Sequence, residues 1–127
     1  MGTIHVSTEP GGILALKFLG EISDETDINA LRKDIEAVSK AIHDMHSSQG
    51  RGIKITIDIS DFKAGYNSEA IEALIDLAKQ DKALVEKTAV FGGSEKIIVI
   101  GETIAALAGR KNIKFFENKA SALEWLS

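Results

Sequence analysis

The most regular pattern of apolar and polar residues lies at positions 53–59, where isoleucine occupies every second position and polar residues stand between. A period of two is typical of a β-strand, and β-branched side chains favour its extended backbone. The segment through Gly65 lacks this period, which predicts a loop, and Asn67 and Ser68 then have the short polar side chains that cap a helix. We therefore expect an internal strand, a loop and a helix over residues 68–79, with a candidate site at the loop.

Apolar periodicity predicts the first half of the chain as well. Residues 4–6 and 13–22 are expected to form two strands, and Pro10, Gly11 and Gly12 predict a turn that joins them as a hairpin. Between residues 28 and 45 apolar side chains recur at spacings of three and four. That stripe indicates an amphipathic helix of about five turns.

The second half contains one ambiguous stretch. Residues 88–91 and 113–116 predict short strands, and Asn118 caps a final helix. Residues 97–100 alone resemble a strand, but apolar residues continue at helical spacing to position 108. We predict a helix over 94–110 that Gly109 ends, with Gly101 costing it roughly 1 kcal/mol relative to Ala.

These elements follow the order β-β-α-β-α-β-α-β-α. Strands joined through a helix pair in parallel, whereas the first two form an antiparallel hairpin. The predicted fold class is α/β: a mixed sheet of about five strands with an N-terminal antiparallel hairpin and later parallel strands, packed with about four helices. No repeat or low-complexity tract divides residues 1–127, so we expect a single domain.

Composition excludes several classes of function. Fifteen Lys and Arg against nineteen Asp and Glu give a net charge of −4, whereas nucleic-acid binding requires a basic face. The absence of cysteine excludes disulfides and thiol chemistry. The first residues show no export signal, and no apolar stretch is long enough to span a bilayer. We expect a cytoplasmic protein that binds no nucleic acid and does not insert into a membrane.

Several short segments resemble the STAS superfamily. Residues 20–26, Gly-Glu-Ile-Ser-Asp-Glu-Thr, are similar to the segment that leads into the first helix of a STAS domain, and Ile-Asp-Ile-Ser at 57–60 resembles its Asp-Leu-Ser strand end. Residues 88–93, 109–116 and 122–126 resemble more closely the SpoIIAA-like group, a bacterial STAS-type family also described as similar to the CRAL-TRIO lipid-binding fold. The resemblance covers nearly the whole chain, through short and mostly structural motifs.

The resemblance also implies a phosphorylation site. In STAS anti-sigma-factor antagonists the loop after the Asp-Leu-Ser strand carries Asp-Ser-Ser-Gly, and a partner kinase phosphorylates a serine there. The same spacing from Asp58 places Tyr66, Asn67, Ser68 and Glu69 on those positions, so the acceptor position is Asn67 and the motif's Asp and Gly are absent. Ser68 is the remaining phosphorylation candidate, and the alternative is that Ser68 or Asn67 caps the helix.

Other polar groups have simple structural explanations. His43 and His46 have a spacing that metals use, but a solvated helix end explains them. Arg110, Lys111 and Lys114 form a small basic cluster, which we expect at the solvated surface. We therefore name no catalytic residue, no metal ligand and no cofactor.

The leading hypothesis is a regulatory STAS-like domain that binds a protein partner and has no catalytic activity, because no nucleophile–base pair can be assembled. Its partner- or ligand-binding residues would surround the loop after the central strand: Asp61, Phe62, Tyr66, Asn67, Ser68, Gly92 and Gly93. Phe62 alternatively closes the core beneath that loop. The alternative function, which the CRAL-TRIO resemblance implies, is a carrier or sensor of a small apolar ligand or lipid. Self-association as a homodimer through a sheet edge or an apolar helix face is also open.

Overall fold

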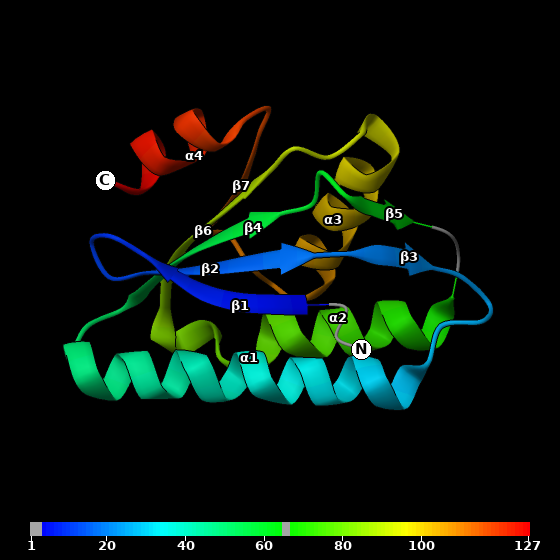
Figure 1. Cartoon of the computed structure of the whole chain (residues 1–127), viewed down its shortest axis with the longest axis horizontal. Helices are drawn as coiled ribbons and strands as arrows, with labels where there is room; N and C mark the ends of the chain where they lie inside the picture. The colour runs from blue at the N-terminus through cyan, green and yellow to red at the C-terminus, as the bar shows by residue number, and fades with distance from the viewer. Residues whose placement is uncertain (1–3, 65–66) are drawn as a thin grey trace.

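The computed structural model describes residues 4–64 and 67–127, and its core is a five-stranded sheet (Figure 1). The spatial order of the strands is β1-β2-β4-β6-β7, and a second, two-stranded sheet pairs β3 with β5. The bounds are β1 Ile4–Glu9, β2 Ile13–Phe18, β3 Gly20–Ile22, β4 Ile53–Asp58, β5 Phe62–Ala64, β6 Val85–Phe91 and β7 Ile113–Phe116.

Strand directions follow from the connections. The tight turn after β1 makes the β1–β2 pair antiparallel, whereas β2–β4, β4–β6 and β6–β7 are parallel and are each joined through a helix. Strand β4 lies in the middle of the sheet, as its isoleucine pattern predicts. The predicted α/β fold class, with a mixed five-stranded sheet and four helices, is confirmed.

The helices cover the two faces of the sheet unequally. Helices α1, α2 and α3 contribute to the main core on one face, and α4 packs on the other face, where Figure 1 shows it apart from α1 and α2. A 3₁₀ turn, η1 (Lys82–Leu84), follows α2. The helix bounds are α1 Ile28–Gln49, α2 Ser68–Gln80, α3 Glu95–Leu107 and α4 Lys119–Leu126.

Local sequence signals account for the helix ends. Asp27, Asn67, Ser94 and Asn118 precede the four helices, and each side chain accepts a hydrogen bond from a backbone N–H in the first turn. The predicted apolar stripe of the first helix is confirmed, since its buried residues lie on one face. The helix continues four residues beyond the expected end at 45, until Gly50 adopts a left-handed conformation with φ 68°.

Several boundaries differ from the expectation, most clearly in three strands. The predicted strand over residues 13–22 divides into β2 and β3, with Gly20 at φ 84° between them. The loop predicted through Gly65 is wrong for Phe62–Ala64, which forms β5 and pairs in parallel with β3. Strand β6 also begins at Val85, earlier than the predicted 88. A three-residue strand is too short to show a period in sequence, so no sequence pattern predicts β5.

Candidate functional site

Two residues of the predicted loop site, Asp61 and Phe62, make contacts that stabilise the fold. Asp61 is exposed and forms an ion pair with Lys17, with 3.2 Å between carboxylate and ammonium. Phe62 is buried, and its ring meets that of Phe18 edge-on with centroids 5.5 Å apart. Phe62 therefore closes the core beneath the loop, the second of the two roles expected for it.

Asn67 and Ser68 stand at the start of α2. The Asn67 Oδ1 atom accepts from the backbone N–H of Ala70 at 3.1 Å, and its Nδ2 donates to the carbonyl of Ser23 at 2.8 Å. Asn67 is thus the helix cap and also ties α2 to the segment before α1. Ser68 is the first residue of the helix and is exposed. Tyr66, the remaining residue of this loop prediction, lies outside the described residues.

Gly92 and Gly93 lie close to Ile59 and Ser60, the two residues that follow β4. Gly92 has φ 87°, and a Cβ atom there would lie 3.0 Å from the Cβ of Ser60. A Cβ on Gly93 would collide with Ile59 and with Ile97, the latter at 2.6 Å. These glycines let the loops after β4 and β6 pack together, so the structure brings Gly92 and Gly93 beside residues 59–60.

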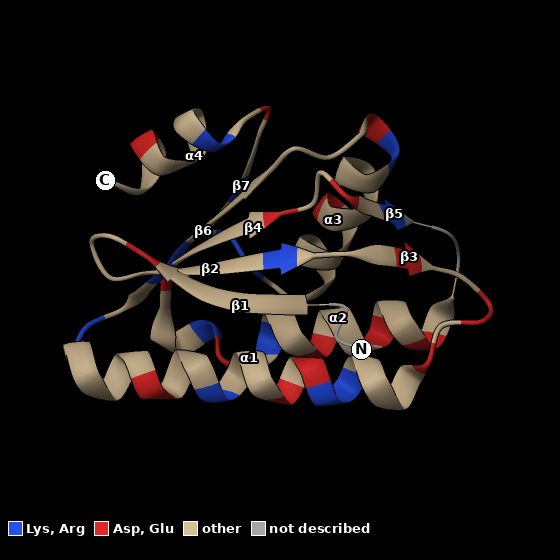
Figure 2. Ribbon diagram, in the orientation of Figure 1, with Lys and Arg blue, Asp and Glu red and all other residues tan. Residues whose placement is uncertain are grey.

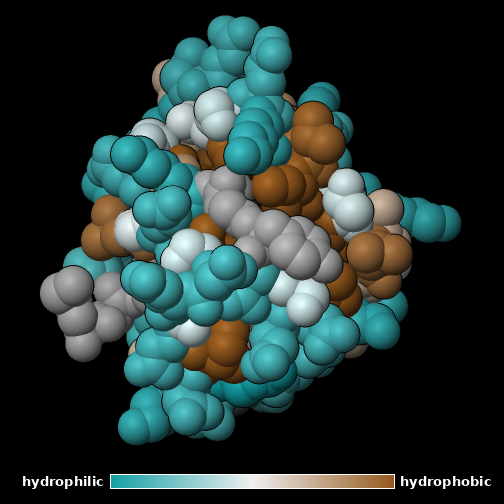
Figure 3. All heavy atoms as spheres, turned by 90° about the vertical axis from the view of Figure 1, so that its right-hand side faces the viewer, coloured by the Kyte–Doolittle hydropathy of each residue, from teal (hydrophilic) through white to brown (hydrophobic). Residues whose placement is uncertain are grey.

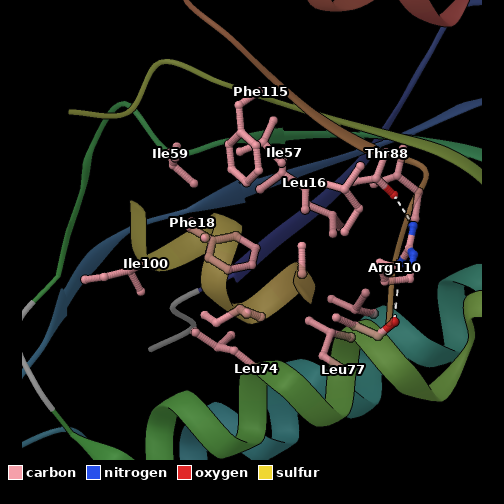
Figure 4. A pocket seen from close by; sticks show the side chains of 18 of the residues that line it. Leu16, Phe18, Ile57, Ile59, Leu74, Leu77, Thr88, Ile100, Arg110 and Phe115 are labelled. Carbon is pink, nitrogen blue, oxygen red and sulfur yellow. Dashed lines mark hydrogen bonds between the residues drawn. The ribbon is translucent and has the colours of Figure 1, made fainter. Parts of the chain in front are cut away.

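A cavity lies between the sheet and helices α1, α2 and α3. It has a volume of about 140 Å³ and reaches from β2 across β4 and β6 to β7. Figure 4 shows the apolar side chains that point into it, among them Leu16, Phe18, Ile57, Leu74 and Phe115. Apart from Asp81, Thr88 and Arg110, the side chains that line it are apolar.

Helix α3 borders the cavity, and few of its apolar side chains are buried. Ile97 is the one residue within α3 that is fully buried, although Ile98, Val99, Ile100 and Ile104 follow on the same helix. Val99 is 60% exposed. Figure 3 shows hydrophobic residues gathered on the face of the molecule that forms the right-hand side of Figure 1. An apolar helix with so little buried surface indicates that its inner side borders unfilled space.

Gly101 allows α3 to approach the sheet. A Cβ atom at this position would lie 2.8 Å from Cε2 of Phe115 on β7. In sequence Gly101 is only a cost to the helix, but in the structure it makes room for an aromatic ring that lines the cavity.

Arg110 forms a polar end to the cavity. Helix α3 ends in a Schellman motif, in which Gly109 N–H bonds to the carbonyl of Ala106 and Arg110 N–H to that of Ala105. The Arg110 guanidinium then donates to Asn112 Oδ1 at 2.8 Å, to Thr88 Oγ1 at 2.9 Å and to the carbonyl of Ala78 at 3.3 Å. Burial lowers the pKa of Arg110 from its usual value. The expectation of a solvated basic cluster is therefore wrong for Arg110.

Asp81 contributes a second charged group beside the end of α2. Its side chain is 5% exposed, and its Oδ1 atom is 2.9 Å from Nε2 of His43 on α1. The Oδ2 atom is the one buried side-chain oxygen or nitrogen without a partner in residues 4–64 and 67–127. No local sequence pattern predicts this pair, because His43 and Asp81 are 38 positions apart.

The ribbon in Figure 2 shows that basic and acidic residues both occur along α1, in the order Arg32, Lys33, Asp34, Glu36, Lys40 and Asp44. Within the described ranges, no group of three or more His, Asp or Glu side chains is placed to hold a metal ion. None of the helices built from those residues combines the length and apolar character needed to cross a bilayer.

Comparison with known proteins identifies the family. The SpoIIAA-like family model matches residues 13–127. The chain belongs to the SpoIIAA-like family. This match confirms the resemblance to the SpoIIAA-like family that the short motifs indicated. A search of curated proteins found no match.

A solved SpoIIAA-like structure supports the fold assignment. An uncharacterized protein from Shewanella loihica PV-4, described as having a SpoIIAA-like fold, superposes with a TM-score of 0.64. The two sequences are 20% identical, and the match covers 98% of this chain and 92% of the other. At that identity the similarity shows a common fold.

Proposed function

We propose that this SpoIIAA-like protein is a non-catalytic binding domain that holds a small apolar molecule between its sheet and helices α2 and α3. The observation that carries the proposal is the cavity of about 140 Å³ with an almost entirely apolar lining. Apolar walls favour an apolar occupant because they offer water few hydrogen-bond partners.

Size decides what this cavity can hold in the conformation described. Protein interiors are packed about as densely as organic crystals, so an unfilled space of this volume is unusual and costs stability. An engineered apolar cavity of about 150 Å³ in another protein stays dry and binds benzene. The proposed ligand is therefore a molecule of benzene-like size, which would recover the dispersion contacts that the empty walls lack.

Native mass spectrometry combined with toluene binding tests this function. The purified protein, desolvated gently, should carry an extra mass that disappears on denaturation, or should bind toluene and unfold at a higher temperature in its presence. Ala105→Leu should block toluene, because Ala105 lines the cavity. Ala106→Leu is the matched control, because the neighbouring Ala106 is exposed on the same helix.

Two outcomes would count against the apolar-ligand function. Toluene that fails to bind or stabilise the wild-type protein removes the evidence that the cavity is accessible. Toluene that binds equally well to both leucine variants must occupy some other site.

A second candidate function, regulation of a protein partner, is supported by the exposure of Ser68. Phosphate on this residue would meet the free backbone N–H groups and positive dipole end of α2. Intact-mass analysis of protein from its native cells should then show a phosphate mass that Ser68→Ala removes. A phosphate that persists in Ser68→Ala lies elsewhere, and protein without phosphate in growing and starved cells would exclude this switch.

A further inference from the structure

Helix α3 presents large apolar residues to solvent as well as to the cavity. Val99 and Leu107 are 60% and 61% exposed, and the third exposed large hydrophobic residue in positions 4–64 and 67–127 is Val6 on β1. Neither Val99 nor Leu107 lines the cavity, which takes its lining from other residues of α3. The outer side of α3 is therefore an apolar surface distinct from the cavity, and such exposure on one helix is typical of a binding surface.

The exposed residues have the same spacing on both sides of Thr103. Val99 precedes Thr103 by four residues and Leu107 follows it by four, so the three exposed side chains lie along one face of the helix. We call Val99, Thr103 and Leu107 the outer stripe. The Thr103 hydroxyl donates to the carbonyl of Val99 in the same helix at 2.9 Å. The centre of the outer stripe can therefore be covered without leaving a hydroxyl unsatisfied.

We propose that the outer stripe binds the outer stripe of a second copy of this chain, with the two α3 helices antiparallel and a twofold axis at Thr103. In this arrangement Val99 of each copy packs against Leu107 of the other, because both residues are four positions from the axis. One surface thus supplies both halves of the contact. The inference goes beyond the proposed function, since it concerns the side of α3 that does not line the cavity.

The charges at the two ends of α3 favour the antiparallel orientation. Glu95 lies in the first turn, and Lys111 is exposed just beyond the other end. The Lys82 ammonium is also at that end, 3.6 Å from the position that a Cβ atom on Gly109 would take. The ion pairs found in residues 4–64 and 67–127 include none of these three charged groups. Antiparallel pairing brings each Glu95 toward the lysines of the other copy, and the neighbouring Lys96 toward the negative end of the opposing helix dipole.

The size of α3 indicates a reversible dimer. The helix has 13 residues and is about 20 Å long, so one pair of helices buries less surface than a permanent dimer does. We expect a dissociation constant of about 10–100 μM. Sedimentation velocity of the full chain over a range of concentrations should therefore show a monomer that is converted to a dimer as the concentration rises.

Two aspartate variants locate the contact. Leu107→Asp should raise the dissociation constant at least about tenfold, because it places a carboxylate against Val99 of the other copy. Val6→Asp is the matched control, because Val6 is the exposed large hydrophobic residue outside α3, and it should change the constant by less than about threefold. Circular dichroism of both variants checks that they are folded.

An introduced cysteine tests the orientation of the two helices. The chain has no cysteine, so a single one can form a disulfide only between two copies. Thr103→Cys places the two sulfur atoms at the twofold axis and should be oxidised to a linked dimer at least about tenfold faster than Glu102→Cys. The Glu102 side chain is exposed too, but it points about 100° away around the helix.

Four results would overturn the inference. They are a protein that stays monomeric at all concentrations, a dimer that Leu107→Asp leaves intact, a dimer that Val6→Asp disrupts equally, and equal oxidation of the two cysteine variants. A monomer that sediments with anionic phospholipid vesicles, and loses this binding in Leu107→Asp, would overturn it in favour of a membrane surface. All of these results leave the cavity and its proposed ligand untouched, because the outer stripe does not line the cavity.

Discussion

Filling the cavity with protein atoms should stabilise the protein in the absence of ligand. Ala105 lines the cavity from α3, and leucine at this position extends three further carbon atoms from the helix toward the sheet. An empty cavity of about 140 Å³ costs about 3 kcal/mol at the usual penalty per unit volume, which sets the upper limit of the gain.

The expected gain can be estimated from the added carbon atoms. Three buried carbons contribute about 2.4 kcal/mol, and restricting the leucine side chain costs about 0.5–1 kcal/mol. The net increase in the free energy of unfolding for Ala105→Leu is then about 1.5 kcal/mol. For a domain of this size that corresponds to a rise in melting temperature of about 6 °C.

Chemical and thermal denaturation of Ala105→Leu and Ala106→Leu measure this gain against a matched control. Both variants make the same small change in helix propensity, but Ala106 is exposed and its leucine fills no space. A smaller free energy of unfolding for Ala105→Leu than for Ala106→Leu would refute the reasoning, since it would mean that the space is already occupied or cannot accept a side chain.

Further substitutions test the other contacts described above. Gly101→Ala should raise the free energy of unfolding by less than the roughly 1 kcal/mol expected from propensity, and should weaken toluene binding, because the new Cβ pushes an aromatic ring into the cavity. Asn67→Ala should lower the free energy of unfolding, measured in urea, by about 1–2 kcal/mol. The loss should exceed that of Asn118→Ala, because Asn67 caps its helix and also donates to the carbonyl of Ser23 before α1. Equal losses in the two variants would contradict this. His43→Ala should lower the free energy of unfolding by about 1–3 kcal/mol, because it removes the hydrogen-bond partner of the buried Asp81 carboxylate. The same substitution in an Asp81→Leu background should lower it by much less. An equal loss in both backgrounds would show that His43 acts through other contacts.

The elements that could be predicted from sequence are those with long periodic patterns or local end signals. The stripe of α1, the central strand β4 and the helical assignment of α3 all extend over enough residues for periodicity to decide. Strands β3 and β5 have three residues each and pair with each other, although the paired residues, such as Gly20 and Phe62, are 42 positions apart in sequence. Such pairing depends on tertiary structure and has no local signature.

The candidate site was harder to predict, because its lining comes from segments spread from Leu16 to Phe115 that meet only in the tertiary structure. Arg110 stands in a basic segment typical of a surface, and its burial follows from the Schellman turn together with Thr88 and Asn112. Asp81 lies in a polar stretch that gives no hint of burial. The one usable signal was α3, whose apolar residues outnumber those a single buried face requires.

The strand order of the main sheet has a consequence for how fast the chain can fold. Only β1 and β2 are neighbours joined by a tight turn, whereas Ile13 of β2 meets Lys54 of β4, 41 positions later. The central strand therefore gains its partners only after long segments have been brought together, and the entropy of closing those loops precedes the contacts that compensate it. Refolding should accordingly be slower than that of a helical bundle of equal length and stability, and substitutions in the β1–β2 turn should alter the folding rate less than substitutions between β2, β4 and β6.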